Sequence, residues 1–502
     1  MATVRLQRSR ATEEPLDVVA LAGLAMTRAA GAPAIEGNSV TLLRDAAENF
    51  PAWKSAIANA QRTILFECYI VADDAVGREF AGILAERARA GVKVAVVVDW
   101  LGCWSSLKIW HDVRAAGGEV RVFNPPRLSS PLGWLSRDHR KTIVVDGTVG
   151  FVSGLCVSQR WLGDPARELE PWRDTGIEIR GPAIAALEVA FADVFGSCAG
   201  APLAEALITQ TKAIPRAGDV RMHVIANEPN VAGTFRMDLI VASIARRNLW
   251  LTDAYFVGTT PYVQALRSAA RDGVDVRLLV PGSSDIPALS PLSRSQYRPL
   301  LEAGVRVFEW NGTMLHAKTA VADGLWARVG STNLNLASWL SNFELDVAIE
   351  DRGFAERLAA QYEEDLTRST EIVLTPRNRV RRANAPSPPS PSAARAQARR
   401  AMSGSAGRAA AGAVSVGSAL GAALTNRRTL GPAEAGLLFI MAVTAAVIGI
   451  VAALWPRIVA WPLAVIAIWF GAAWAVKAYA VRHGRAEAPC PEPLRDVDDS
   501  RA

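Results

Sequence analysis

The chain repeats itself along its length. Between residues 63 and 324, segments of the first half return in the same order in the second half. The matched pairs are two strand-like stretches that end at Tyr69 and Tyr255, the segments Arg87–Val94 and Ala269–Val276, the segments Gly117–Phe123 and Ala303–Phe308, and two histidine clusters. Four matches in one order predict a duplicated domain. The fold must therefore be one that two similar halves can build.

Helical and strand-like patterns alternate within each half. Thr63–Val71 has the composition of a strand, residues 80–90 form an amphipathic helical pattern that Gly91 ends, and Val92–Val98 is typical of a buried strand. This alternation predicts an α/β fold of two pseudo-symmetric halves, each with a mixed sheet that is parallel at its centre. The expected boundaries are an N-terminal extension at 1–34, a first half at 35–200 and a second half at 201–376.

The composition changes after residue 376. Residues 377–432 are rich in Arg, Ala, Pro and Ser and contain no acidic residue, which predicts a linker. Two runs without charge follow at 435–455 and 458–476. Each is close to the roughly 20 residues that cross a bilayer as a helix. We expect a two-helix transmembrane hairpin over 433–478, with a buried helical hairpin as the alternative, and then a polar tail over 479–502.

Basic residues lie on both outer sides of this hairpin, whereas its turn holds only Arg457. The flanking residues are Arg427, Arg428, Lys477, Arg482 and Arg485. The positive-inside rule then predicts that both termini and the α/β body face the cytoplasm, at a bacterial inner membrane. The formal charge of the chain is +6, and the ten arginines between Arg377 and Arg428 leave −4 for the rest. The basic excess therefore favours an anionic membrane surface as partner and gives no reason to expect nucleic acid.

Each histidine cluster contains a lysine two positions after the histidine and an aspartate five positions further on. The two sets are His139, Lys141, Asp146 and His316, Lys318, Asp323. Residues two apart on an extended strand project from the same face, so each histidine and its lysine should enter one site. Two of the five histidines of the chain occupy equivalent places in the repeats, which favours a functional role for this pair.

Two histidines and two lysines that converge across a pseudo-twofold axis suit phosphodiester chemistry. One imidazole can attack phosphorus, the other can protonate the leaving oxygen, and the lysines can hold the negative charge. No cofactor is expected. A metal site is not expected either, because neither histidine cluster has the carboxylates that Mg²⁺ prefers or the Cys, Asp or Glu spacing of a zinc site.

The two HxKxxxxD motifs resemble those of the phospholipase D superfamily. The second is followed by Gly330–Asn333, similar to the superfamily's GSxN element, and by Asn342–Glu344. Over roughly residues 35–376 the chain looks most like bacterial cardiolipin synthases. The further matching segments are Glu67–Tyr69, Asp99–Gly102, Pro171–Thr175 and Tyr255–Phe256.

This resemblance implies roles for individual residues. His139 would be the nucleophile that forms a phosphohistidine, and His316 the general acid and then base, although the quasi-symmetric halves leave open which histidine attacks. The residues implied to bind substrate phosphate are Lys141, Lys318, Ser331 and Asn333. Asp146 and Asp323 complete the implied catalytic set. Supporting roles are implied for Glu67, Tyr69, Tyr255 and Glu344.

The first half departs from the family pattern at one position. Ser153–Cys156 stands where a GGxN-like element is expected, so Cys156 replaces the usual asparagine. A thiol is a poor substitute for an amide in hydrogen bonding, so the change could lower activity or alter the acceptor. We interpret Cys156 as a small buried residue, with a nucleophilic role as the alternative.

The resemblance also implies the reaction. Such enzymes transfer a phosphatidyl group from one phosphatidylglycerol to another and release glycerol, so phosphatidylglycerol and other anionic phospholipids are the expected partners. Hydrolysis through the same intermediate, by a phospholipase D or a nuclease, is the alternative enzymatic reading. The alternative that is not an enzyme is a membrane scaffold derived from one. The insert with Pro131–Leu135 and the segment Cys103–Trp110 could together form an apolar, partly basic rim that meets the membrane. Ordinary packing of these tryptophan-bearing loops onto the core is the alternative.

Overall fold

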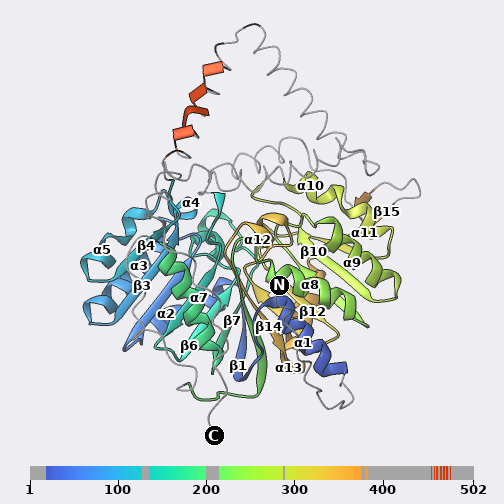
Figure 1. Ribbon diagram of the computed structural model, residues 1–502, viewed down its shortest axis with the longest axis horizontal. Helices are drawn as coiled ribbons and strands as arrows, with labels where there is room; N and C mark the ends of the chain where they lie inside the picture. The colour runs from blue at the N-terminus through green and yellow to red at the C-terminus, as the bar shows by residue number, and fades with distance from the viewer. Residues whose placement is uncertain are drawn as a thin grey trace, which may run out of the picture. The chain divides into compact units, whose positions relative to one another are not determined.

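The predicted α/β architecture is confirmed by a computed structural model (Figure 1). It describes residues 18–126, 135–198, 214–286, 289–374 and 380–382, and scattered positions between 454 and 475. The chain divides into one unit of Met1–Asn124 with Ser136–Ala435 and another of Pro125–Leu135 with Gly436–Ala502. All of the strands within the described ranges belong to the first unit, which carries the candidate site.

Seven strands of the first half lie side by side in one sheet. They are β1 (Ile35–Arg44), β2 (Thr63–Cys68), β3 (Lys93–Asp99), β4 (Glu119–Phe123), β5 (Lys141–Val145), β6 (Val149–Ser153) and β7 (Thr175–Arg180). Their order across the sheet is β1-β7-β6-β5-β2-β3-β4. Strands β2, β3 and β4 are parallel to one another, and the remaining pairs are antiparallel. The expectation of a sheet that is parallel at its centre is therefore wrong, because the parallel strands lie at the outer side of the half.

The strands of the second half follow the same order. They are β8 (Val220–Asn227), β9 (Asn248–Thr252), β10 (Asp275–Pro281), β11 (Arg306–Trp310), β12 (Thr319–Ala322), β13 (Trp326–Gly330) and β14 (Glu344–Glu350). Across the sheet they run β8-β14-β13-β12-β9-β10-β11, and β15 (Ser369–Leu374) and β16 (Val380–Arg382) extend this edge. Strands β1 and β8 pair antiparallel and join the halves. Strand β16 falls at the start of the predicted linker.

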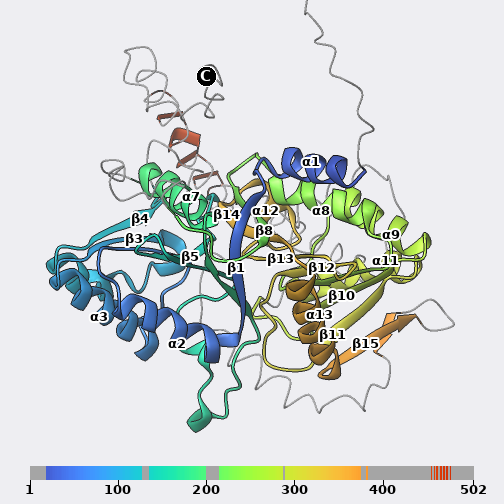
Figure 2. The same ribbon diagram turned by 90° about the horizontal axis from the view of Figure 1, so that it is seen from below.

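Helices cover both faces of each half. In Figure 2, α2 (Asp45–Ala58) and α3 (Ala75–Arg89) lie on the opposite side of the first-half strands from α7 (Ala183–Ser197). The second half places α8 (Gly233–Ile244) and α9 (Thr260–Arg271) opposite α13 (Arg352–Thr367). Helix α1 (Val18–Ala30) packs with α8, where Met26 and Ala30 are buried. Shorter helices are α4 (Trp100–Cys103), η1 (Leu107–Trp110), α5 (His111–Ala115), α6 (Gln159–Leu162), η3 (Pro165–Arg167), α10 (Leu289–Ser295), α11 (Tyr297–Leu301) and α12 (Leu336–Leu340).

Local sequence signals explain the first βαβ unit. The Asp74 side chain accepts a hydrogen bond from the Gly77 backbone N–H and caps α3 at its start. Gly91 follows the helix with φ +88°, a conformation that costs glycine little and other residues more. Strand β3 then begins within one residue of the predicted start.

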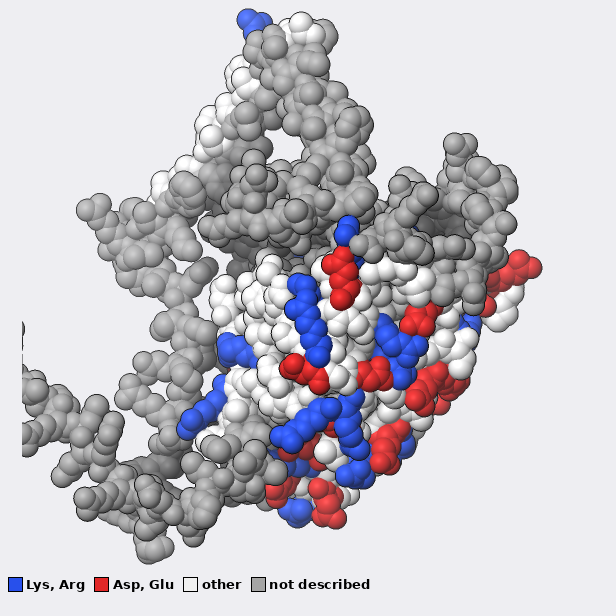
Figure 3. Space-filling model, turned by 90° about the vertical axis from the view of Figure 1, so that its right-hand side faces the viewer, with Lys and Arg blue, Asp and Glu red and all other residues white. Residues whose placement is uncertain are grey.

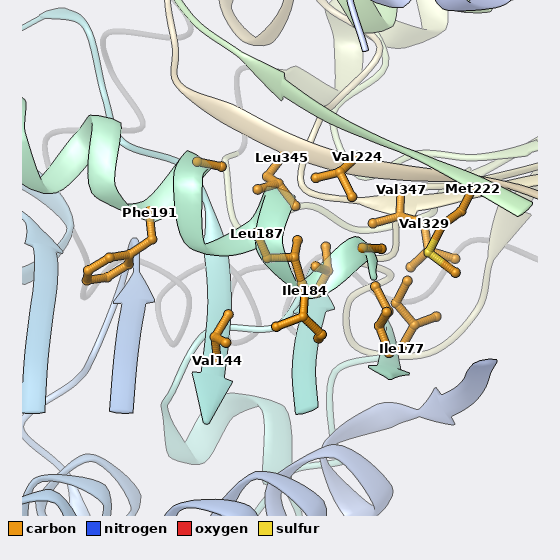
Figure 4. Packing of buried hydrophobic residues seen from close by; sticks show 14 of the residues in the cluster. Val144, Ile177, Ile184, Leu187, Phe191, Met222, Val224, Val329, Leu345 and Val347 are labelled. Carbon is orange, nitrogen blue, oxygen red and sulfur yellow. The ribbon is translucent and has the colours of Figure 1, made fainter. Parts of the chain in front are cut away.

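One apolar core connects the two halves. Ile184, Leu187 and Phe191 of α7 pack in a cluster that also contains Val329 of β13 and Leu345 of β14 (Figure 4). Further members come from β6, β7, β8 and α13. Burial on this scale fixes the halves against each other, since each apolar side chain of this size contributes about 1.5–3 kcal/mol when buried. The site described below is built from both halves and depends on this packing.

The predicted membrane hairpin falls largely outside the described residues. The spans 435–455 and 458–476 are described only at scattered helical positions between 454 and 475. The polar tail and, apart from β16, the linker also lie outside the described residues. Within the part of the chain that is described, no helix combines the length and apolar character needed to cross a membrane.

Candidate active site

The two histidines are brought together at one edge of the sheet. Strand β5 runs antiparallel to β2, and β12 runs antiparallel to β9, so both histidines lie near the carboxyl ends of the parallel strands. In Figure 1 the short helices α4, α10 and α12 lie along this edge. Backbone bonds cross between the halves here: the His139 N–H donates to the Phe343 carbonyl at 2.9 Å, and the His316 N–H donates to the Arg173 carbonyl at 2.7 Å.

Each histidine pairs with a carboxylate from the other half. Nδ1 of His139 lies 2.9 Å from Oε2 of Glu344, and Nδ1 of His316 lies 2.8 Å from Oδ2 of Asp174. Because a carboxylate can only accept, we assign the proton to Nδ1 in both pairs, which leaves the lone pair of Nε2 available for chemistry. Asp174 lies in the matching segment Pro171–Thr175, for which the resemblance implied no role. One sequence feature could have identified it: Asp174 is an acidic residue at the start of the last core strand of its half. Glu344 takes the same place in the second half.

Both carboxylates have further hydrogen-bond donors. Oε2 of Glu344 accepts from the Ser331 hydroxyl at 2.6 Å, and Oδ2 of Asp174 accepts from the Trp161 indole N–H at 2.8 Å. Burial raises the pKa of each carboxyl group, but the adjacent histidine, lysine and donors outweigh it and hold each pKa below its usual value. The two groups therefore stay ionised near neutral pH.

The imidazoles themselves are neutral near pH 7. Burial, more than any other cause, lowers the pKa of His139 to about 4, and burial together with the charge of Lys318 lowers that of His316 to about 4. The carboxylate partners oppose this shift without cancelling it. A neutral imidazole oriented by a carboxylate is the form that can attack phosphorus or accept a proton.

These two pKa values predict an effect of pH on stability. In the unfolded chain a histidine has a pKa of about 6.5. From pH 6.5 down to about 4 the unfolded state binds more protons on these two residues than the folded state, so their contribution to stability falls as the pH falls. We expect wild type to lose about 1–2 kcal/mol more per histidine than His139→Gln/His316→Gln between pH 7 and pH 5. Urea unfolding at both pH values measures this, and equal losses would mean that the folded imidazoles are charged.

The two lysines are held beside the histidines. Lys141 Nζ donates to the His139 carbonyl oxygen, and Lys318 Nζ donates to that of His316. Lys318 Nζ also lies 2.8 Å from Nδ1 of His316, a close approach without a hydrogen bond, because the Nδ1 proton is donated to Asp174. Burial lowers the pKa of Lys318 to about 8, with Asp174 acting in the opposite direction. Both lysine side chains are therefore placed beside the histidines to bind a phosphate oxygen.

Two tyrosines take equivalent places beside the histidines. The Tyr69 ring lies 4.9 Å from the His139 ring, and the Tyr255 ring lies 5.8 Å from the His316 ring. Each tyrosine also faces the lysine of its own half, at 5.2 Å for Lys141 and 5.9 Å for Lys318. The rings therefore form part of the wall of the site, and the Tyr255 hydroxyl donates to Asp285 at 2.8 Å.

Glu67 lies behind this wall. It is 1% exposed on β2 and, like Leu65, projects toward the core shared by the halves. Burial and the neighbouring Asp138 raise the pKa of Glu67 well above its usual value, and burial raises that of Asp138 to about 7. A supporting role for Glu67 would therefore act through Asp138, next to His139.

The aspartates of the two motifs lie away from the histidines. Asp146 accepts hydrogen bonds from the backbone N–H groups of Arg62 and Thr63 at 2.7 and 2.8 Å. Asp323 accepts equivalent bonds from Arg247 and Asn248 at 2.7 and 3.1 Å. Both follow their strand at the end opposite the histidine, seven residues further on, which is roughly 23 Å along a fully extended chain. These carboxylates therefore do not lie with the histidines and lysines, as the expected catalytic set implied. They fix the turns that lead into β2 and β9.

The remaining expected residues are buried at the same edge. Ser331 directs its hydroxyl to Glu344, and Asn333 is 4% exposed with its side-chain nitrogen 3.5 Å from the Ser338 hydroxyl. Cys156 is 1% exposed and packs in the apolar core of the first half. Burial raises the pKa of its thiol, but a hydrogen bond from Cys68 and the charge of Lys141 outweigh this and lower it. Among the described residues, no three or more His, Cys, Asp or Glu side chains are grouped to hold a metal ion.

Comparisons with known proteins give consistent matches. A family model described as "Cardiolipin synthase, PLD-like domain" matches residues 240–366. Cardiolipin synthase of Halalkalibacterium halodurans is 32% identical over 352 residues, which cover 69% of each chain. Cardiolipin synthase A of Pseudomonas aeruginosa is 35% identical over 364 residues, covering 71% of this chain and 73% of that protein. A crystal structure of phosphatidylserine synthase from Haemophilus influenzae Rd KW20 shares the fold, with a TM-score of 0.56 and 14% identity over 70% of this chain and 92% of that one.

Proposed function

Because this chain belongs to the cardiolipin synthase family of the phospholipase D superfamily, we propose that it makes cardiolipin from two phosphatidylglycerol molecules and releases glycerol. Its relatives and its fold identify a phosphatidyltransferase of that superfamily. The observation that carries the proposal is the pair of neutral histidines, each oriented by a carboxylate and each beside a buried lysine.

The first half-reaction forms a covalent intermediate. Nε2 of His139 attacks the phosphorus of one phosphatidylglycerol, and the bond from phosphorus to the headgroup glycerol oxygen breaks. The anionic phosphate of the bound lipid favours a proton on Nε2 of His316, which is neutral in the free site. His316 gives this proton to that oxygen, and glycerol leaves. Lys141 and Lys318 hold the phosphate oxygens while negative charge develops on them. The products are a phosphatidyl-histidine, free glycerol and a neutral His316.

The second half-reaction returns the enzyme to its starting state. The terminal hydroxyl of a second phosphatidylglycerol gives its proton to Nε2 of His316 and attacks the phosphorus. The bond from phosphorus to nitrogen breaks, which frees His139 and yields cardiolipin. Water in place of that hydroxyl would give phosphatidic acid, so the acceptor decides between transfer and hydrolysis. Cys156, at the usual asparagine position, is one residue through which the choice of acceptor could differ in this chain.

The proposal is tested with the full chain and phosphatidylglycerol vesicles. We expect cardiolipin and free glycerol in equal amounts, with neither product from His139→Ala. Phosphatidic acid as the only lipid product would assign hydrolysis. No product of either kind, together with a His139→Ala variant that still supports cellular function, would assign a scaffold role.

A nuclease is less well supported by the surface of the protein. On the face shown in Figure 3, acidic and basic side chains are interspersed. The surface ion pairs Arg298–Glu302 and Arg306–Glu371 likewise place opposite charges side by side. A groove for a nucleic-acid backbone requires one sign of charge along its length. We therefore propose a lipid substrate for this site.

We also propose that the enzyme works at the cytoplasmic face of a bacterial membrane. The predicted hairpin at 433–478 would anchor it there, and the arginine-rich linker would keep the catalytic unit near anionic lipid. A reporter that is active only in the periplasm, fused after Ala502, should give no signal. A strong signal would reverse the orientation.

One exposed tryptophan lies on the edge of the sheet that carries the site. Trp104 is 57% exposed just after α4, and Gly102 of α4 packs against the Tyr69 carbonyl. Trp110 is fully buried, so the expectation that it joins an apolar rim is wrong. We expect Trp104→Glu to lower turnover of vesicle phosphatidylglycerol about 10-fold, because the interface loses roughly one buried aromatic contact.

The matched control for this prediction is Leu325→Glu. Leu325 is 46% exposed in the turn between β12 and β13, at the opposite edge of the sheet. Turnover of a short-chain phosphatidylglycerol dissolved as monomers should be unchanged in both variants. If Trp104→Glu slows the dissolved substrate as much as the vesicles, Trp104 acts on the site and not on the membrane contact.

A further inference from the structure

The two histidine-carboxylate pairs are equivalent, but the groups that hold the carboxylates are not. In the second half, the Ser331 hydroxyl donates to Oε2 of Glu344 at 2.6 Å. When Ser153–Cys156 is aligned with Gly330–Asn333, the first-half position that matches Ser331 is Gly154. Glycine has no hydroxyl to donate. A Cβ atom added at Gly154 would also lie 2.2 Å from Oδ1 of Asp174, so the space for a serine side chain is already filled by the carboxylate.

Trp161 supplies the missing donor from a different position. Its indole N–H donates to Oδ2 of Asp174 at 2.8 Å, the same oxygen that lies 2.8 Å from Nδ1 of His316. The other oxygen, Oδ1, accepts from the Thr175 backbone N–H at 2.8 Å. Both oxygens of Asp174 are therefore bonded, and the carboxylate has one fixed orientation toward the histidine.

The Trp161 ring is itself held in place. It is 2% exposed on α6, a helix whose first turn is capped by the Ser158 hydroxyl, and Ser158 donates to Asp74 at 2.9 Å. The ring lies 4.6 Å from Trp172 and stands at 90° to the His316 ring at 5.3 Å. These aromatic side chains keep water from the pair formed by Asp174 and His316. A water molecule could therefore replace a lost hydrogen-bond donor only at a cost in free energy.

We propose that Trp161 is a positioning residue, which orients His316 through its hydrogen bond to Asp174. The indole N–H does for His316 what the Ser331 hydroxyl does for His139. The assignment rests on the proposed function only in the choice of assay, because any turnover that uses His316 reports it. Removal of the indole donor leaves Asp174 held by the Thr175 N–H alone on the side away from His316 and makes the carboxylate easier to protonate. His316 then loses part of its orientation and of its stabilising charge.

The direct test compares Trp161→Phe with two matched variants. Trp161→Phe keeps an aromatic ring and removes the N–H. Ser331→Ala removes the equivalent donor on the other side. Trp339→Phe is the control, since Trp339 is 1% exposed on α12 and its indole nitrogen has no hydrogen-bond partner. We expect Trp161→Phe to lower kcat about 10- to 100-fold with little change in KM, and Trp339→Phe to leave kcat nearly unchanged.

The pH profile separates positioning from simple packing. Loss of a donor raises the pKa of the carboxyl group, so the acid limb of the kcat profile should move to higher pH in Trp161→Phe and Ser331→Ala, and should stay in place in Trp339→Phe. In a His316→Ala background, Trp161→Phe should have no further effect on the residual rate. The proposal would be overturned if Trp161→Phe lowered the rate further in the His316→Ala background. It would also be overturned if the acid limb of the kcat profile stayed in place in Trp161→Phe.

If Trp161→Phe folds poorly, a side chain of the same size and shape as tryptophan provides the test. Incorporation of 3-benzothienylalanine at position 161 keeps the size of the side chain and places sulfur where the N–H was. It should reproduce the kinetic loss at wild-type stability, and wild-type kcat in this protein would overturn the proposal. If wild type releases glycerol but forms no cardiolipin, the proposed acceptor is wrong, while glycerol release still tests Trp161.

Discussion

A chain with His139→Ala should lose phosphatidyl transfer by at least about 10³-fold, with a folded state as stable as that of wild type. His316→Ala should cause a similar loss on phosphatidylglycerol, because the glycerol oxygen needs a proton in order to leave. The two variants should differ on a phosphatidyl ester of p-nitrophenol. That leaving group departs without protonation, so His316→Ala should recover most of its first half-reaction and His139→Ala should not.

Release of p-nitrophenol in a single turnover is the appropriate measurement. A labelled acyl chain that stays on the denatured His316→Ala protein would show the covalent intermediate. The opposite pattern, with recovery in His139→Ala, would assign the attack to His316 and exchange the two roles. Recovery in both variants would exclude a histidine nucleophile altogether. The quasi-symmetric geometry of the site makes this comparison the one that decides the roles.

Arg328→Leu should destabilise the protein by about 3–5 kcal/mol, a loss typical of a buried charge left without its partner. Arg328 is 0% exposed in β13, with Nη1 at 2.8 Å from Oδ1 of Asp346 and Nε at 3.2 Å from Oδ1 of Asp238. Burial raises the pKa of Asp238 to about 7 even with the arginine present. Without it, two buried carboxyl groups would have to be neutralised or exposed. Urea unfolding followed by circular dichroism measures the loss.

The control for this variant is Arg352→Leu. Arg352 forms an ion pair with Glu356 on the surface of α13, and its side chain is 62% exposed. Such a pair contributes at most about 1 kcal/mol. Adding Asp238→Asn and Asp346→Asn to Arg328→Leu should recover part of the stability. If Arg328→Leu costs no more than Arg352→Leu, the carboxyl groups do not depend on this arginine.

Local sequence patterns were sufficient to predict the α/β elements and the pairing of each histidine with its lysine. The period of two places His139 with Lys141, and the apolar run at residues 92–98 marks a strand, because both signals lie within a few residues. The contacts that complete the site join positions far apart. His316 and Asp174 are 142 residues apart, and His139 and Glu344 are 205 apart, so no local period could reveal them.

For the motif aspartates, the local sequence pattern was clear but its interpretation was wrong. Asp146 and Asp323 stand at fixed spacing from the histidines, and this regularity suggested a shared task. Their carboxylates instead cap backbone N–H groups of neighbouring turns. Both residues adopt φ of +54°, a left-handed conformation that Asp tolerates better than most side chains. The aspartate at one end of the strand thus meets a need of the backbone, the capping of a turn. The histidine and lysine at the other end form the candidate site.

The exchange of carboxylates between the halves has a consequence for how activity can be lost or gained. Neither half contains a complete histidine-carboxylate pair, since Glu344 serves His139 and Asp174 serves His316. A fragment limited to the first half, residues 35–200, therefore keeps His139 and Lys141 but holds no oriented imidazole of its own. The catalysis proposed above would then be a property of the docked halves, so it would appear only after synthesis and folding of the second half are complete. An incomplete chain would lack the assembled site.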